Sequence, residues 1–80
     1  MATYKLSVSK RFGKFYYTFH QATEQGKENA DGLDQLDDVL KAVAKDFEGH
    51  VKSAEDSVIF RGIAYDSWNA LKQVVRSSPF

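Results

Sequence analysis

The chain has 80 residues, no cysteine and a formal net charge of zero at pH 7, and 42% of its residues are hydrophobic. This composition is that of a folded chain and excludes disulfides and thiolate metal sites. The length favours a single domain over residues 1–80, and the neutral total argues against bulk attraction to nucleic acid. Without an apolar run that resembles a signal peptide or a membrane span, we expect a cytoplasmic protein with no membrane partner.

Residues 3–9 and 14–20 alternate between apolar and polar side chains, which is the period of half-buried strands. Gly13 lies between the two runs and predicts a hairpin bend. If the apolar residues of the two strands lie opposite one another, three cross-strand pairs are expected: Val8 with Phe15, Leu6 with Tyr17, and Tyr4 with Phe19. The opposite face of the sheet is expected to stay in water, and it carries Lys5, Ser7, Ser9, Lys14, Tyr16, Thr18 and His20.

The polar residues 21–31 are expected to form a long loop. After them, apolar residues recur at helical spacing from Leu33 to Phe47, which predicts an amphipathic helix. Asp31 is the expected N-cap of this helix and Gly49 its expected terminator. Three acidic residues lie near the expected N-terminus of this helix, where the positive end of the helix dipole favours them: Asp34, Asp37 and Asp38.

Residues 57–63 are apolar enough to predict a central strand, whereas residues 50–57 are compatible with a helix end, a loop or a short extra strand. Asp66 or Ser67 precedes a second amphipathic helix. Its predicted inner face consists of Trp68, Leu71, Val74 and Val75. The predicted fold is α+β, a small antiparallel sheet of three or four strands with two helices packed on one face, in the order β-β-α-β-α.

Sequence motifs for catalysis, metal binding or cofactor binding are absent. The nucleophile elbow Gly-x-Ser-x-Gly and the Walker and dinucleotide patterns do not occur. His20 and His50 each lack a second histidine at metal-ligand spacing. In residues 31–38, leucines at helical spacing interrupt the oxygen ligands that a calcium loop would need. We therefore expect no enzyme activity, no catalytic residues, no metal and no cofactor.

The charges are sorted along the chain. Residues 1–20 carry four basic side chains and no acid, and residues 21–40 carry six acids against Lys27 alone. This pattern favours a small protein-interaction module, an inhibitor or regulator that docks on a basic partner through an acidic helix face. Many small inhibitors carried by phages and mobile elements are likewise short domains without catalytic motifs. This similarity is an analogy and not a motif match. The residues expected to bind the partner are Asp34, Asp37 and Asp38.

The alternative function is nucleic-acid binding through the basic, aromatic hairpin. Lysine and arginine side chains would neutralise phosphates there, while aromatic rings would stack on bases. The residues that would form this site are Lys5, Lys10, Arg11, Phe12, Lys14 and Tyr16. A homodimer formed through an exposed edge strand is the third hypothesis.

Overall fold

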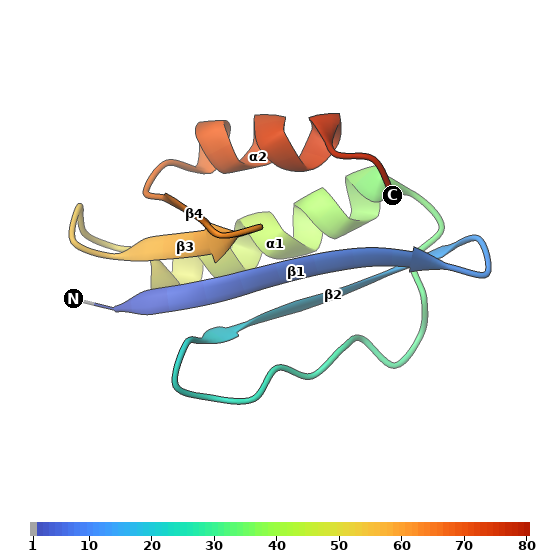
Figure 1. The fold of residues 1–80 in the computed structure, drawn as a ribbon, viewed down its shortest axis with the longest axis horizontal. Coiled ribbons are helices and arrows are strands. Elements are labelled where there is room, and N and C mark those ends of the chain that lie inside the picture. Colours follow the sequence, from blue (N-terminus) through green and yellow to red (C-terminus); the bar gives the residue numbers. More distant parts are fainter. Residues whose placement is uncertain (1) are drawn as a thin grey trace.

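The computed structural model describes residues 2–80. Its elements are β1 (Thr3–Arg11), β2 (Lys14–Gln21), α1 (Leu36–His50), β3 (Ser57–Phe60), β4 (Ile63–Tyr65) and α2 (Trp68–Ser77). The strands form one sheet in the order β2-β1-β3-β4, with the two helices packed next to each other (Figure 1). This arrangement confirms the predicted α+β class. No helix within residues 2–80 has both the length and the apolar character that a membrane crossing requires.

The sheet is mixed and not wholly antiparallel as predicted, because β1 pairs antiparallel with β2 but parallel with β3. β4 returns antiparallel to β3 through a tight turn at Arg61 and Gly62. The strand predicted over residues 57–63 is therefore two short strands, and the extra strand follows the third instead of preceding it. The φ values of 53° at Arg61 and 84° at Gly62 are those of a two-residue hairpin turn, which the apolar run had concealed.

The predicted hairpin of β1 and β2 is confirmed, but its predicted register is wrong by two residues. Its turn consists of Phe12 and Gly13, with φ values of 53° and 76°. Tight hairpin turns of this kind need positive φ at both central residues, and glycine meets that need without steric cost. The position of Gly13 therefore sets the observed pairs, which are Val8 with Tyr17, Leu6 with Phe19, and Tyr4 with Gln21.

α1 begins later than predicted, because Leu33 pairs with β2 and does not enter the helix. The backbones of Leu33 and Phe15 exchange two hydrogen bonds, of 2.7 and 2.9 Å. Gln35 is the N-cap, so the prediction that Asp31 caps the helix is wrong. Asp34 also lies outside the helix, between the bridge and the cap.

The predicted terminator of α1 is also wrong, since Gly49 lies inside the last helical turn. The N–H of Val51 closes that turn by donating to the carbonyl of Phe47 at 2.8 Å. Residues 51–56, which were ambiguous in sequence, form no strand. α2 begins directly after Ser67, one of its two predicted caps, although the Ser67 side chain makes no capping hydrogen bond.

The core lies between one face of the sheet and the two helices, and residues 2–80 contain no buried polar or charged residue. Leu71 and Val75 of α2 are buried as predicted, whereas Trp68 and Val74 are only partly buried. Strand alternation and helical spacing together direct the following side chains inward: Tyr4, Leu6, Val8, Phe15, Val39, Leu40, Val43, Phe47, Val58, Phe60, Leu71 and Val75.

Candidate functional site

The connection between β2 and α1, residues 22–35, runs along the outer edge of β2 (Figure 1). The side-chain Oδ1 of Asn29 accepts a hydrogen bond from the N–H of Tyr17 at 2.9 Å. Together with the backbone bridge between Phe15 and Leu33, this contact occupies part of the edge of β2. An occupied edge is a poor template for pairing with a second chain. The opposite edge strand, β4, is only three residues long.

The same connection partly covers the open face of β2, which was expected to stay in water. A Cβ at Gly26 would lie 2.6 Å from Cδ2 of His20, and one at Gly32 would lie 3.0 Å from Cζ of Tyr16. At Gly26 and Gly32 the connection therefore packs closely against these side chains, and a larger residue would clash with them. On this face the exposed residues are Lys5, Ser7 and Lys14, and the half-buried ones are Ser9, Tyr16, Thr18 and His20.

We call residues 24–38 the acidic segment, since they carry six carboxylates and one lysine. Two ion pairs join this segment to the hairpin. Nη2 of Arg11 lies 2.7 and 2.8 Å from the two carboxylate oxygens of Glu28, and its guanidinium covers the ring of Tyr16 at 4.4 Å. Lys14 pairs with Asp34, and this hydrogen bond raises the pKa of the Lys14 ammonium group. The charges that are separated in sequence therefore partly neutralise each other in the fold.

The three acidic residues expected to bind a partner do not share one helix face. Asp34 precedes α1, whereas Asp37 and Asp38 are consecutive residues of its first turn. Asp37 is exposed and Asp38 is half-buried. The prediction of an acidic helix face is corrected to an acidic surface along the whole segment, because Leu33 binds β2 and delays the helix.

Five of the six residues expected to bind nucleic acid lie at the turn end of the hairpin, whereas Lys5 pairs with His20 towards its other end. Their availability also differs. Phe12 is fully exposed, at 100%. Arg11 and Lys14 form ion pairs, whereas Lys5 and Lys10 form none within residues 2–80. Tyr16 is half-buried beneath the Arg11 guanidinium, so one face of its ring is not free to stack on a base.

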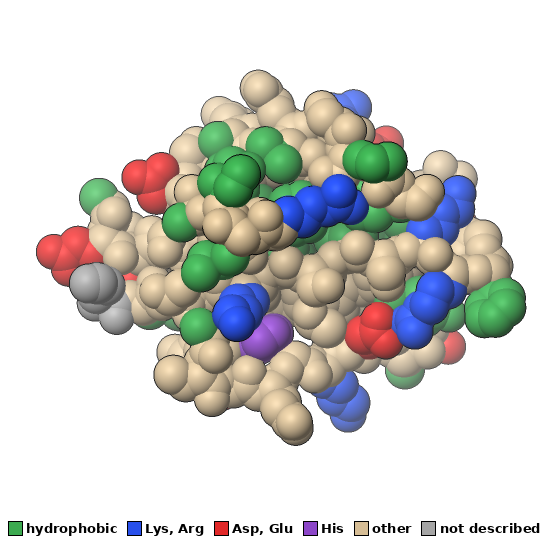
Figure 2. Space-filling model, viewed as in Figure 1, with side chains coloured by type: hydrophobic (Ala, Val, Ile, Leu, Met, Phe, Trp, Pro, Cys, Tyr) green, Lys and Arg blue, Asp and Glu red, His purple; other side chains and the backbone are tan. Residues whose placement is uncertain are grey.

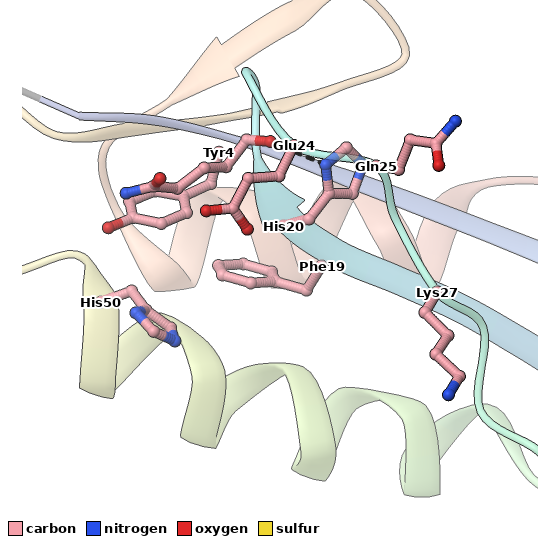
Figure 3. Close-up of a pocket in the computed structure, with 8 residues that line it drawn as sticks. Tyr4, Phe19, His20, Glu24, Gln25, Lys27 and His50 are labelled. Carbon is pink, nitrogen blue, oxygen red and sulfur yellow. Dashed lines mark hydrogen bonds between the residues drawn. The ribbon is translucent and has the colours of Figure 1, made fainter.

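The structure brings His20 and His50 to one pocket of about 400 Å³, although they are distant in sequence (Figure 3). The His50 ring lies 5.4 Å from the ring of Tyr4 and 5.9 Å from that of Phe19. Nδ1 of His20 lies 2.8 Å from the carbonyl oxygen of Gln21. Residues 2–80 contain no group of three side chains that could hold a metal ion. The pocket therefore offers an aromatic wall, and the sequence contained no local signal for it.

A groove runs between α1 and α2, where two cavities of about 320 and 440 Å³ share Ala44 and Trp68. Sequence periodicity assigned Trp68 to the core, and its ring does pack against Phe47 at 5.8 Å. Trp68 is nevertheless only half-buried, and it forms part of the groove wall. Periodicity describes one helix at a time, so it could not reveal a surface formed by two helices.

Comparison with known proteins finds no matching family model, no matching curated protein and no matching solved structure.

Proposed function

We propose that the protein is a small interaction module, an inhibitor or regulator, that binds a basic partner protein through the acidic segment. The observation that carries the proposal is the number of uncompensated carboxylates on this segment. Four of them form no ion pair within residues 2–80: Glu24, Asp31, Asp37 and Asp38. Carboxylates held along one side of a folded domain attract a basic surface and raise its association rate more than its affinity.

The two internal ion pairs position the segment and still leave it able to bind. The side chain of Asp34 stays 71% exposed in its pair with Lys14, and that of Glu28 stays 42% exposed in its pair with Arg11. Exposed ion pairs contribute little stability and are screened by salt. A lysine or arginine of a partner can therefore replace Lys14 at Asp34 without a large loss of folding free energy.

The test is capture of partners from a lysate of the source organism on the immobilised protein, with and without nuclease. The test variant combines Asp34→Asn and Asp38→Asn. The matched control combines Glu55→Gln and Asp66→Asn, which removes the same charge from exposed positions outside the segment.

We expect one discrete protein to be retained by the wild type and the control after nuclease treatment, and to be lost by the test variant. Retention of that protein by all three forms would contradict docking through the acidic segment. Loss of all retained material after nuclease would contradict protein binding itself and would favour the hairpin.

Nucleic-acid binding through the hairpin remains a second candidate, and the full exposure of Phe12 is the observation that favours it. An exposed ring can stack on an unpaired base. The Lys10 ammonium group lies over the Phe15 ring, at 5.3 Å from its centroid. The ion pairs of Arg11 and Lys14 count against this candidate, because they leave few free cations for phosphates. Figure 2 agrees, since on the face it shows Lys and Arg are spread among other side chains and form no single basic patch.

The two candidates differ in their dependence on salt. Each phosphate contact lowers the affinity by roughly 0.7–0.9 log units per tenfold rise in salt. Binding of a fluorescent single-stranded oligonucleotide, measured by anisotropy at several salt concentrations, tests this directly. Absent or salt-independent binding would exclude the hairpin as a nucleic-acid site.

A further inference from the structure

We propose that the groove between α1 and α2 is a second docking site, and that its occupant is an acidic peptide segment of a partner protein, anchored by a large apolar side chain. We call this surface the interhelical groove. Its residues are Asp37, Leu40, Lys41, Ala44, Phe47, Glu48, Val51, Trp68, Lys72 and Arg76.

Two facing stripes of side chains form the basic part of the groove. α2 contributes Trp68, Lys72 and Arg76, and α1 contributes Lys41 and Ala44. Residues three or four apart lie on the same face of a helix, so the side chains of each stripe stand in line. The two helices lie next to each other (Figure 1), and side chains of both line the same cavity, so the stripes stand on opposite sides of one groove.

The other part of the groove is an apolar hollow of about 440 Å³. Its walls are the rings of Phe47 and Trp68, whose centroids are 5.8 Å apart, and the side chains of Val51 and Glu48. The short side chain of Ala44 belongs to both cavities, and so it leaves the hollow continuous with the basic part. A leucine or an aromatic side chain of a partner would bury apolar surface here, in the way that an amphipathic helix binds a groove.

The charges around the groove select the sign of the occupant. None of Lys41, Lys72 and Arg76 forms an ion pair within residues 2–80. Asp37 is the one acid beside these three cations in the basic part, and the second acid of the groove, Glu48, lines the apolar hollow. The excess of positive charge therefore lies in the basic part. An acidic occupant would therefore be attracted and a basic one repelled, since charge complementarity decides which partners are accepted.

The apolar hollow favours a peptide over a nucleic acid. Nucleic-acid interfaces are more polar and follow a phosphate backbone with many cations. Here the three cations line one cavity and an apolar hollow adjoins it. This arrangement is complementary to a short peptide that has acidic residues on one side of a large apolar residue. This inference goes beyond the proposed function, because it concerns a partner surface of opposite charge.

A random-peptide library displayed on phage tests the inference, with the immobilised 80-residue chain as bait. The charge-reversed variant is Lys72→Glu/Arg76→Glu, and the matched control is Lys45→Glu/Lys52→Glu, which changes two exposed cations outside the groove. Circular dichroism establishes that each variant is folded. We expect the selected peptides to combine Asp or Glu with leucine or an aromatic residue. Selected peptides that are basic, or that share no pattern, would overturn the inference.

Trp68 is the single tryptophan of the chain, so its fluorescence reports directly on the groove. A selected peptide that lacks tryptophan should shift the Trp68 emission to shorter wavelength. Its affinity should fall by about tenfold or more in the charge-reversed variant and should not change in the control. An unchanged emission, or equal affinity for both variants, would overturn the inference.

A third variant separates this inference from the proposed function. Asp34→Asn/Asp38→Asn changes the acidic segment but no residue of the groove. We expect it to bind the selected peptide as the wild type does. If the peptide is lost in this variant and kept in Lys72→Glu/Arg76→Glu, the peptide binds the acidic segment and the groove proposal is wrong.

Discussion

Lys14, the first residue of β2, forms an ion pair with Asp34, which lies two residues before α1. This contact joins the basic N-terminal part of the sequence to its acidic middle, and Arg11 with Glu28 joins them a second time. The connection between the hairpin and α1 is thus held against β2 by both backbone and side-chain contacts. The fold leaves three surfaces of different character, namely the acidic segment, the exposed ring of Phe12 and the interhelical groove.

Replacing Phe12 with asparagine is expected to raise the free energy of unfolding by about 1 kcal/mol. Phe12 has a φ of 53°, a left-handed conformation that asparagine tolerates better than a bulky residue. Its ring is 100% exposed, so its removal costs no buried contact. Urea denaturation followed by Trp68 fluorescence measures the change.

The second hairpin turn supplies the control for this prediction. Arg61 has the same φ of 53°, but its guanidinium lies 5.5 Å from the Phe60 ring and 5.4 Å from that of Phe80. Arg61→Asn should therefore gain less stability than Phe12→Asn, because it loses these contacts. A lower stability of Phe12→Asn than of the wild type would show that the ring makes a contact within the fold.

Replacing Gly32 with alanine is expected to destabilise the protein by about 1–3 kcal/mol, the usual cost of overpacking. The new Cβ would lie 2.9 Å from Cγ of Lys14 and 3.0 Å from Cζ of Tyr16. The connection would have to move away from β2, which strains the hydrogen bonds of Leu33. Denaturation gives the stability, and hydrogen exchange at the Leu33 amide reports the local opening.

Gly49→Ala is the matched substitution, since no atom lies within 4 Å of a Cβ at this position in α1. Alanine is the better helix former, so this variant should gain about 0.5–1 kcal/mol. A Gly32→Ala variant as stable as Gly49→Ala would mean that the connection does not pack closely on β2.

The sequence predicted the local elements better than the relations between them. Alternation and helical spacing are local properties, and they identified the first hairpin and both helices. The turn at Arg61 and Gly62 was missed because the residues on both sides are apolar enough for one continuous strand. The helix start was misplaced because Leu33 fits the helical spacing equally well, and only its backbone pairing with Phe15 takes it out of the helix.

The candidate surfaces were less predictable, because each one is formed by segments distant in sequence. Lys14 and Asp34 are twenty residues apart, and their pairing depends on the path of the connection along β2. Trp68 has the spacing of a core residue, and its place in the groove wall depends on how α1 packs beside α2. Composition and periodicity contain neither of these relationships.

Asp56 is expected to stabilise the protein at neutral pH and to lose this effect in acid. Its carboxylate accepts hydrogen bonds from the backbone N–H groups of Lys52, at 3.2 Å, and Ala2, at 2.9 Å. These bonds lower the pKa of Asp56 from its ordinary value of 3.8. The folded state thus favours the ionised form, so the stabilisation is present above the unfolded pKa and is lost as the pH falls through the folded pKa.

The measurement for Asp56 is thermal unfolding of Asp56→Asn by circular dichroism from acid to neutral pH. The variant should melt below the wild type at neutral pH, and the two curves should converge in the acid range below the ordinary pKa. Glu55→Gln, a neighbouring exposed acid, is the control and should melt like the wild type throughout. A constant difference at every pH would show that the hydrogen bonds act independently of the charge.

Asp46 should have the opposite pH dependence. Burial raises the pKa of Asp46 above its ordinary value of 3.8, and His50 on the next helical turn offsets this in part. The folded state thus binds the proton more readily than the unfolded state, so ionised Asp46 lowers stability as the pH rises through the folded pKa. Asp46→Asn should therefore melt above the wild type at neutral pH, and this gain should disappear in acid.

A second readout for Asp46 comes from Tyr17. Burial, followed by the charge of Asp46, raises the pKa of the Tyr17 phenol above its ordinary value of 10.0. Asp46→Asn removes the charge but keeps the burial, so ultraviolet titration should show the tyrosine ionising at a lower pH than in the wild type. Glu48→Gln, an exposed acid of the same helix, should change neither the melting curve nor the titration. A lower melting temperature of Asp46→Asn at neutral pH would mean that the carboxylate forms a stabilising contact that outweighs its desolvation.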